Sequence, residues 1–171
     1  MRIQIETERL FIRNIALDDY LAAFQWCGDP IVNTYMLYPL YENAEDVKGW
    51  ISSLDSEAEN GAEVVFILKE NGAIIGGGGI HCTSDKNVWE IGYNLNRAHW
   101  GHGYAPEAMQ GLIDYLKNIA DVKAVQATFC AENLKSLRVA EKLGMSYLED
   151  GECWKLDGSK KFITKTYRKY I

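Results

Sequence analysis

Residues 63–95 contain three consecutive strand-like segments, which restrict the possible folds more than any other feature of the chain. The runs EVVFIL and AIIGGGGIH flank Asn71-Gly72, the dipeptide that best suits a two-residue hairpin. A short polar turn, SDKN, then leads into the run VWEIGYNL. This order predicts a meander of three antiparallel strands.

The rest of the chain alternates between helical and extended patterns. Before the meander, residues 5–15 are typical of a strand, and two segments with helical spacing follow them. After the meander, apolar residues recur at helical spacing over 106–119, and a short strand precedes a second helix that Gly144 ends. Two strands around Asp157-Gly158 close the chain. The sequence therefore predicts a mixed, mostly antiparallel α/β sheet of six to seven strands, flanked by about four helices.

Composition and charge narrow the class of protein. The 171 residues are 47% hydrophobic and 25% charged, and no linker or low-complexity tract divides them, so we expect one domain over residues 1–171. A net charge of −6 argues against a nucleic-acid partner, because such a partner needs a basic face. The first residues mix charged with apolar side chains, and no apolar run reaches membrane-spanning length. These features predict a cytoplasmic protein with neither a nucleic-acid nor a membrane partner.

The segment WGHGYAPEA places small residues at alternate positions, Gly101, Gly103 and Ala105, immediately before a helix. The first N–H groups of a helix have no partners within it and, together with the helix dipole, attract negative charge. Small residues there allow a phosphate to approach those N–H groups. One interpretation is a cradle for a pyrophosphate, and the alternative is a loop that only turns the chain. The segment lacks the Lys-Ser/Thr of a Walker P-loop, and Pro106 replaces the third glycine of a dinucleotide fingerprint.

Three polar side chains outside this turn are candidates for chemistry. Glu90 lies mid-strand on the same face as Gly92 and Asn94, and it either enters a cleft or faces solvent on the sheet. Asn133 and Ser136 lie three residues apart at the start of the second crossover helix, so they share one helical face. Asn133 could serve only as an N-cap, which would leave the inward position of Ser136 unexplained.

Taken together, these motifs resemble a known family. WGHGYAPEA, preceded by EIGYNLN and followed by AENLKSLRVAEKLGM, is similar to the acyl-CoA site of the GNAT acetyltransferase superfamily. The opening TERLFIR resembles its RimJ/RimL-type branch, which includes N-terminal acetyltransferases of ribosomal proteins. The resemblance extends from about Glu6 to the final strands and implies a GNAT-like acyl-CoA N-acyltransferase fold. It also implies direct transfer of an acetyl group from acetyl-CoA to a primary amine: a protein N-terminus, an amino acid or a small molecule.

The resemblance further implies roles for particular residues. In the family, the amides of the glycine turn hold the pyrophosphate of acetyl-CoA, and the preceding strand opens to receive the pantetheine arm. Glu90 is then the proton acceptor, Ser136 lies near the thioester sulfur, and Tyr35 and Tyr38 belong to the acceptor wall. Coenzyme contacts are expected at Tyr93, Asn94, Leu95, Asn96, Trp100, Gly101, His102, Gly103, Tyr104, Ala105, Asn133 and Ser136.

The chain departs from the family pattern at several positions. Trp100 stands where the general motif has Gln or Arg, although Trp is common in the RimJ/RimL-type branch. Pro106 replaces a Ser or Thr that often contacts phosphate, and His102 replaces a frequent Lys or Arg. Ala140 occupies the position of a tyrosine that acts as general acid in many members. Ser136 or water must then protonate the leaving thiolate.

Other expectations concern partners. His99 and His102 have no third ligand near them in the sequence, so no metal site is expected. The partners implied are acetyl-CoA and an amine acceptor, and both a monomer and a homodimer fit the sequence. A non-catalytic acyl-CoA-binding sensor that uses the same glycine turn is the alternative function.

Overall fold

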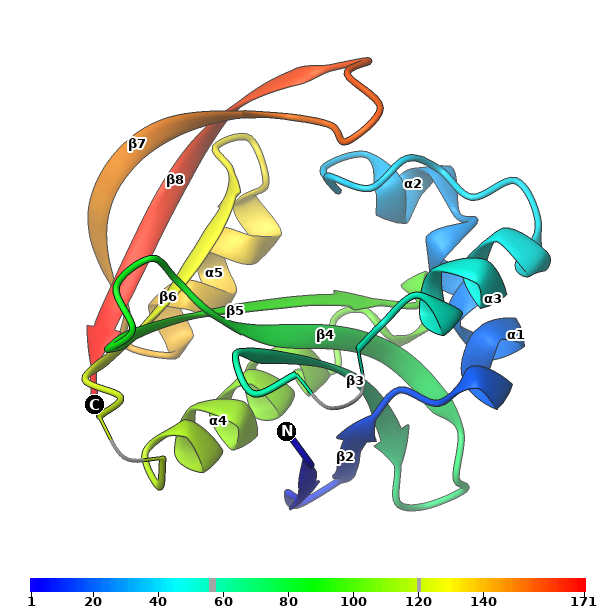
Figure 1. The fold of residues 1–171 in the computed structure, drawn as a ribbon, viewed down its shortest axis with the longest axis horizontal. Coiled ribbons are helices and arrows are strands. Elements are labelled where there is room, and N and C mark those ends of the chain that lie inside the picture. The colour runs from blue at the N-terminus through cyan, green and yellow to red at the C-terminus, as the bar shows by residue number, and fades with distance from the viewer. Residues whose placement is uncertain (56–57, 120) are drawn as a thin grey trace.

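The computed structural model of the protein describes residues 1–55, 58–119 and 121–171, and within them eight strands form one sheet (Figure 1). The strands are β1 Gln4–Glu6, β2 Leu10–Asn14, β3 Gly61–Leu68, β4 Ile74–Cys82, β5 Val88–Leu95, β6 Ala124–Cys130, β7 Ser146–Trp154 and β8 Lys161–Tyr170. The α-helices among the same residues are α1 Tyr20–Cys27, α2 Pro30–Asn33, α3 Ala44–Ser52, α4 Tyr104–Leu116 and α5 Leu134–Lys142.

The sheet has the order β1-β2-β3-β4-β5-β6-β8-β7. Strands β5 and β6 pair in parallel, and the other neighbouring pairs are antiparallel. This arrangement confirms the predicted mixed, mostly antiparallel sheet. The meander is confirmed as well, with Gly72 at φ 73° in the hairpin between β3 and β4.

The described residues contain one more strand and one more helix than the sequence predicts. The segment taken as a single opening strand folds back on itself at Thr7, whose hydroxyl accepts a hydrogen bond from the Leu10 amide at 3.0 Å. The extra helix, α2, has Pro30 in its first turn and is capped by Asp29, whose carboxylate accepts from the Ile31 amide at 2.8 Å. Both additions depend on short polar turns rather than on hydrophobic periodicity.

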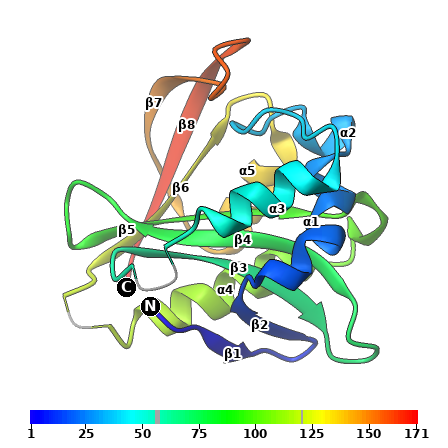
Figure 2. The ribbon, with the colours of Figure 1, turned by 45° about the vertical axis from the view of Figure 1, so that its right-hand side comes forward.

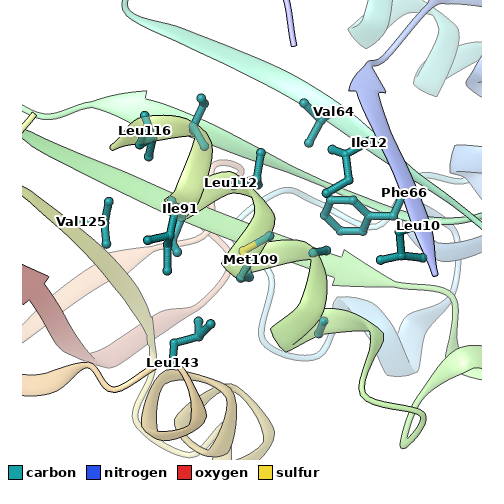
Figure 3. Packing of buried hydrophobic residues seen from close by; sticks show 14 of the residues in the cluster. Leu10, Ile12, Val64, Phe66, Ile91, Met109, Leu112, Leu116, Val125 and Leu143 are labelled. Carbon is teal, nitrogen blue, oxygen red and sulfur yellow. The ribbon is translucent and has the colours of Figure 1, made fainter. Parts of the chain in front are cut away.

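Helices cover both faces of the sheet (Figure 2). Helix α4 packs on one face because its buried residues recur at helical spacing, and Figure 3 shows Met109, Leu112 and Leu116 against Phe66 and Ile91 of the sheet. On the other face, α1 and α3 enclose a smaller cluster: Ala23, Trp26, Cys27, Val32, Val47 and Ile51. Within the described residues, no helix has the length and hydropathy needed to span a membrane.

Strands β5 and β6 stay together only briefly. Their register covers three pairs, of which the last joins Glu90 to Gln126. Beyond it, β5 continues along β4 to Leu95, whereas β6 continues along β8 to Cys130. The two strands therefore diverge at the centre of the sheet, and Figure 1 shows β5 continuing beside β4 while β6 turns away beside β8.

Candidate active site

Two adjoining cavities occupy the opening between β5 and β6. The first, here called the α5 cavity, has a volume of about 800 Å³ and lies between the glycine turn and α5. The second, here called the sheet cavity, has a volume of about 690 Å³ and lies over β3–β6 beside the loop that follows α2. Seven residues line both cavities, which makes them one continuous passage: Tyr35, Met36, Tyr93, Asn94, Asn133, Ser136 and Val139.

The glycine turn forms one end of the α5 cavity. Gly101 and Gly103 have φ angles of 82° and 81°, a region that only glycine adopts without strain. Gly103 is the N-cap residue of α4, and no side chain caps the first turn of that helix. The amide groups at the start of α4 therefore have no side-chain cap, which is the arrangement that a phosphate cradle needs.

A side-chain brace fixes this turn from behind. Glu107, in the first turn of α4, accepts hydrogen bonds from the Thr7 hydroxyl at 2.6 Å and from the Arg9 amide and Nε at 2.7 Å each. Arg9 also donates to the His102 carbonyl at 2.9 Å and stacks over the Tyr104 ring. Burial alone would raise the pKa of Glu107, but the hydrogen bonds from Thr7 and Arg9 outweigh it and lower the pKa. The hairpin between β1 and β2 thus holds the glycine turn in shape.

Because Arg9 braces the turn without lining the cavity, Arg9→Ala should weaken coenzyme binding indirectly. We expect the dissociation constant of CoA to rise about three- to tenfold, the effect of losing one preorganising side chain. Titration calorimetry with CoA measures the change, and Arg2→Ala on the same N-terminal segment is the control. An unchanged dissociation constant in Arg9→Ala would show that the brace does not support binding.

The α5 cavity is also lined by three cations, which are not among the site residues predicted from the sequence. Lys135, Arg138 and Lys142 lie at spacings of three and four on α5, so they form one row along the cavity wall. Lys135 Nζ lies 3.6 Å from the centre of the Trp100 ring, and Trp100 Nε1 donates to the Leu95 carbonyl at 3.0 Å. The row and the glycine turn line the same cavity, so the cavity suits a ligand with several negative charges.

Ser136 and Tyr93 meet where the two cavities join. Asn133 caps α5, since its Oδ1 accepts from the Ser136 amide at 3.2 Å. The Ser136 and Tyr93 side chains both line this junction, and burial raises the pKa of Tyr93, so the phenol retains its proton. The N-cap alternative for Asn133 is therefore correct, and Ser136 adds a hydroxyl to the junction.

Glu90 lies on the wall of the sheet cavity rather than on a solvated face of the sheet. Gln126 Nε2 donates to Glu90 Oε2 at 3.0 Å, and Arg168 Nη2 donates to Gln126 Oε1 at 2.7 Å. These two bonds orient one oxygen of the carboxylate through a neutral amide. Gln126 and Arg168 come from β6 and β8, and the sequence analysis did not identify either residue.

Tyrosines from the loop after α2 form the opposite wall. Tyr35 lines both cavities, and Tyr38 lines the sheet cavity. Asn94 Nδ2 donates to the Tyr38 hydroxyl at 3.2 Å, and Tyr38 hydrogen-bonds to the Cys27 thiol. Burial raises the pKa of Cys27 to about 12, so this thiol is protonated and is a poor nucleophile.

The remaining predicted residues divide into two groups. Leu95, Trp100, Tyr104 and Ala105 line the α5 cavity together with the two glycines. Asn96 and His102 lie outside its lining. The Asn96 side chain accepts from the Ala98 amide and donates to Gln25, and the His102 ring stacks on Tyr104.

The two cavities differ in charge. Lys135, Arg138 and Lys142 line the α5 cavity beside one carboxylate, that of Glu132, whereas the described lining of the sheet cavity holds the carboxylates of Glu63 and Glu90 and neither Lys nor Arg. The passage therefore suits an anionic ligand at one end and a cationic one at the other. Among the described residues, no group of three or more His, Cys, Asp and Glu side chains is arranged to hold a metal ion.

Comparison with known proteins assigns this chain to an acyltransferase family. Residues 9–146 match the model of the acetyltransferase (GNAT) domain, which is most of the chain. The chain belongs to the GNAT family, whose members transfer acetyl groups from acetyl-CoA. The predicted resemblance is therefore confirmed.

Individual relatives agree with this assignment. A Bacillus licheniformis protein described as an uncharacterized N-acetyltransferase, p20, is 32% identical over 148 residues, which cover 85% of this chain and 82% of that protein. The crystal structure of a GNAT-family acetyltransferase from Bacillus anthracis superposes with a TM-score of 0.86 at 25% identity and covers 98% of both chains. The ribosomal-protein acetyltransferase RimL, solved in complex with coenzyme A, shares the fold with a TM-score of 0.82 at 15% identity, over 100% of this chain and 98% of that one.

Proposed function

We propose that the protein transfers an acetyl group from acetyl-CoA directly to a primary amine, without a covalent acetyl-enzyme. The observation that carries this proposal is the continuous passage whose cationic end adjoins the glycine turn and whose acidic end holds Glu90. A coenzyme with phosphates fits the first end, and an ammonium group fits the second. RimL, which shares this fold, was solved in complex with coenzyme A, and this supports a coenzyme site in the same fold here.

On this proposal, the amides at the start of α4 bind the pyrophosphate, and Gly101 and Gly103 leave room for it. Lys135, Arg138 and Lys142 supply further charge to the phosphate groups. The pantetheine arm lies along β5 from Tyr93 to Leu95, on the edge that β6 has left, and places the thioester at the junction near Ser136.

Glu90 then accepts a proton from the bound ammonium, directly or through a water molecule. The neutral amine attacks the thioester carbonyl, and amides of β5 beyond Glu90 stabilise the oxyanion. When the carbon–sulfur bond breaks, the attacking nitrogen loses its second proton and Ser136 relays a proton to the thiolate, so CoA leaves as the thiol and the serine hydroxyl is restored. Proximity of the two substrates replaces a nucleophilic residue, consistent with the protonated state of Cys27.

The test is a panel of amines, amino acids and N-terminal peptides incubated with acetyl-CoA while free thiol is followed, with mass spectrometry of the products. We expect thiol release to depend on the amine and each reactive amine to gain one acetyl group. Tight binding of acetyl-CoA without amine-dependent release across the panel would instead favour the acyl-CoA-binding sensor.

A further inference from the structure

The carboxylates that line the sheet cavity disfavour binding of an acceptor that carries an acid group. Glu63 on β3 and Glu90 on β5 line it. Two cations outside its lining engage other groups: Arg168 donates to Gln126, and Lys155 donates to the oxygens of Asn33. A carboxylate on the acceptor would thus face two like charges, of which a protonated His81 would offset only one, and the described lining residues include neither Lys nor Arg.

Glu63 does not stand alone, because His81 on β4 lies beside it. His81 Nε2 and Glu63 Oε1 are 3.0 Å apart, and His81 is the direct cross-strand partner of Glu90. The hydrogen bond to Glu63 raises the pKa of His81, against the opposing effect of burial. The imidazole thus modulates how much negative charge Glu63 presents to the cavity.

Two glycines make space for this pair. A Cβ atom on Gly61 would lie 2.5 Å from His81 Nδ1, and one on Gly79 would lie 2.7 Å from His81 Nε2 and 2.9 Å from Glu63 Oε1. Any larger residue at either position would push the imidazole or the carboxylate aside. The position of the His81–Glu63 pair is therefore built into the backbones of β3 and β4.

Beside Glu90 the cavity is open above Gly92, two residues further along β5. Gly92 is the cross-strand partner of Gly79, and a Cβ atom on Gly92 would meet no atom within 4 Å. Its φ angle is not among the positive values of the structure, so the backbone does not require glycine there. The face of Gly92 is therefore open, with Glu90 two residues before it on β5 and the His81–Glu63 pair over Gly79 on the neighbouring strand, so an amine substituent can lie there.

From this geometry we propose that the acceptor is a cationic amine whose substituents carry no acid group, and that Glu63 and His81 set this preference. The proposal deepens the proposed function and rests on it. The proposal disfavours one of the three acceptor classes, the free amino acids, because they carry a carboxylate next to the reacting amine. A carboxylate on the acceptor, added to the two in this cavity, is expected to lower kcat/KM about tenfold.

Matched pairs of acceptors test this preference: phenylalaninol against phenylalanine, and leucinol against leucine. Each pair differs at the α-substituent, a neutral hydroxymethyl group in one member and a carboxylate in the other. We expect the ratio of kcat/KM, alcohol over acid, to be about ten or more in the wild-type protein. Equal rates, or faster reaction of the acids, would overturn the proposal.

Two variants should move this ratio in opposite directions. Glu63→Gln keeps the shape and removes the charge, so the ratio should fall to about threefold or less. His81→Asn removes the neighbouring cation, so the ratio should rise above the wild-type value. Glu152→Gln, an exposed glutamate that pairs with Lys161 on the far strands, is the control and should leave it unchanged. A purely structural role would impair both members of a pair equally, and an unchanged ratio in both variants would overturn the assignment.

Binding measurements separate this proposal from the proposed function. Calorimetric titration of the four compounds into the CoA-saturated protein measures the preference without turnover. Stronger binding of the alcohols without any acetyl transfer would refute the acetyltransferase proposal and support the charge preference. Acetyl transfer without a preference between alcohols and acids would support the acetyltransferase proposal and refute the charge preference. If none of the four compounds binds, the charge preference is also overturned.

Discussion

Replacing Glu90 with glutamine is expected to lower kcat by about 10²- to 10⁴-fold, the usual contribution of a general base. The substitution keeps the shape of the side chain, and the Gln126 amide can still donate to the new amide oxygen as it does to Glu90 Oε2. Amines are mostly protonated at neutral pH, so removal of the proton acceptor leaves the nucleophile blocked. Coenzyme affinity should stay within about twofold, because Glu90 lines the sheet cavity and not the α5 cavity.

Steady-state kinetics with the best amine of the panel measure kcat, and calorimetry with CoA measures affinity. Glu152→Gln on the exposed strand β7 serves as the matched control. A Glu90→Gln variant with near wild-type kcat would assign proton removal to another group. A variant that loses CoA binding instead would place Glu90 in the coenzyme site.

The parts of the fold that follow from local pattern were predictable from the sequence. Strand β5 spans Val88–Leu95, the same eight residues as the run VWEIGYNL, because a polar turn precedes it and a period-two pattern fills it. The glycine turn was equally visible, since positive φ angles at Gly101 and Gly103 leave few alternatives to glycine. Hydrophobic periodicity and unusual backbone conformations depend on short stretches of sequence, so they can be predicted from the sequence alone.

The surroundings of Glu90 and Glu63 were not predictable in the same way. Gln126 reaches Glu90 because β6 pairs with β5 in one particular register, and a shift of one residue would turn Gln126 to the other face. His81 reaches Glu63 through the register of β3 with β4 and through the space above Gly61 and Gly79. Such contacts depend on strand pairing over long sequence separations, which one sequence does not specify.

The basic row on α5 lies between these cases. Lys135, Arg138 and Lys142 have helical spacing, so their common face could be read from the sequence, but a charged helical face is usually just solvated. A role for this row in binding an anion is indicated because the glycine turn lines the same α5 cavity. The same limit applies to Asn96 and His102, whose side chains the geometry of the turn directs to other partners.

Replacing Gly103 with valine should raise the dissociation constant of CoA about 100-fold or more, a loss of about 2.7 kcal/mol. Two effects add. The φ angle of 81° is unfavourable for a β-branched residue and should distort the turn, at a cost of about 1–3 kcal/mol. A Cβ atom on Gly103 would also lie 3.5 Å from Arg9 Nη2, so the larger side chain would crowd the brace that holds the amides at the start of α4 in place.

Gly72→Val separates the two effects, because it imposes the same backbone strain at a distant hairpin. Gly72 has a φ angle of 73°, and a Cβ atom there would meet no atom within 4 Å. Both variants should lose thermal stability, by about 2–4 °C per kcal/mol for a chain of this size, whereas only Gly103→Val should lose CoA affinity. A thermal melt measures the melting temperature, and titration calorimetry on a separate portion of the same preparation measures CoA affinity. Wild-type affinity in a folded Gly103→Val variant would mean that the diphosphate binds elsewhere, and the orientation of the whole passage would have to be abandoned.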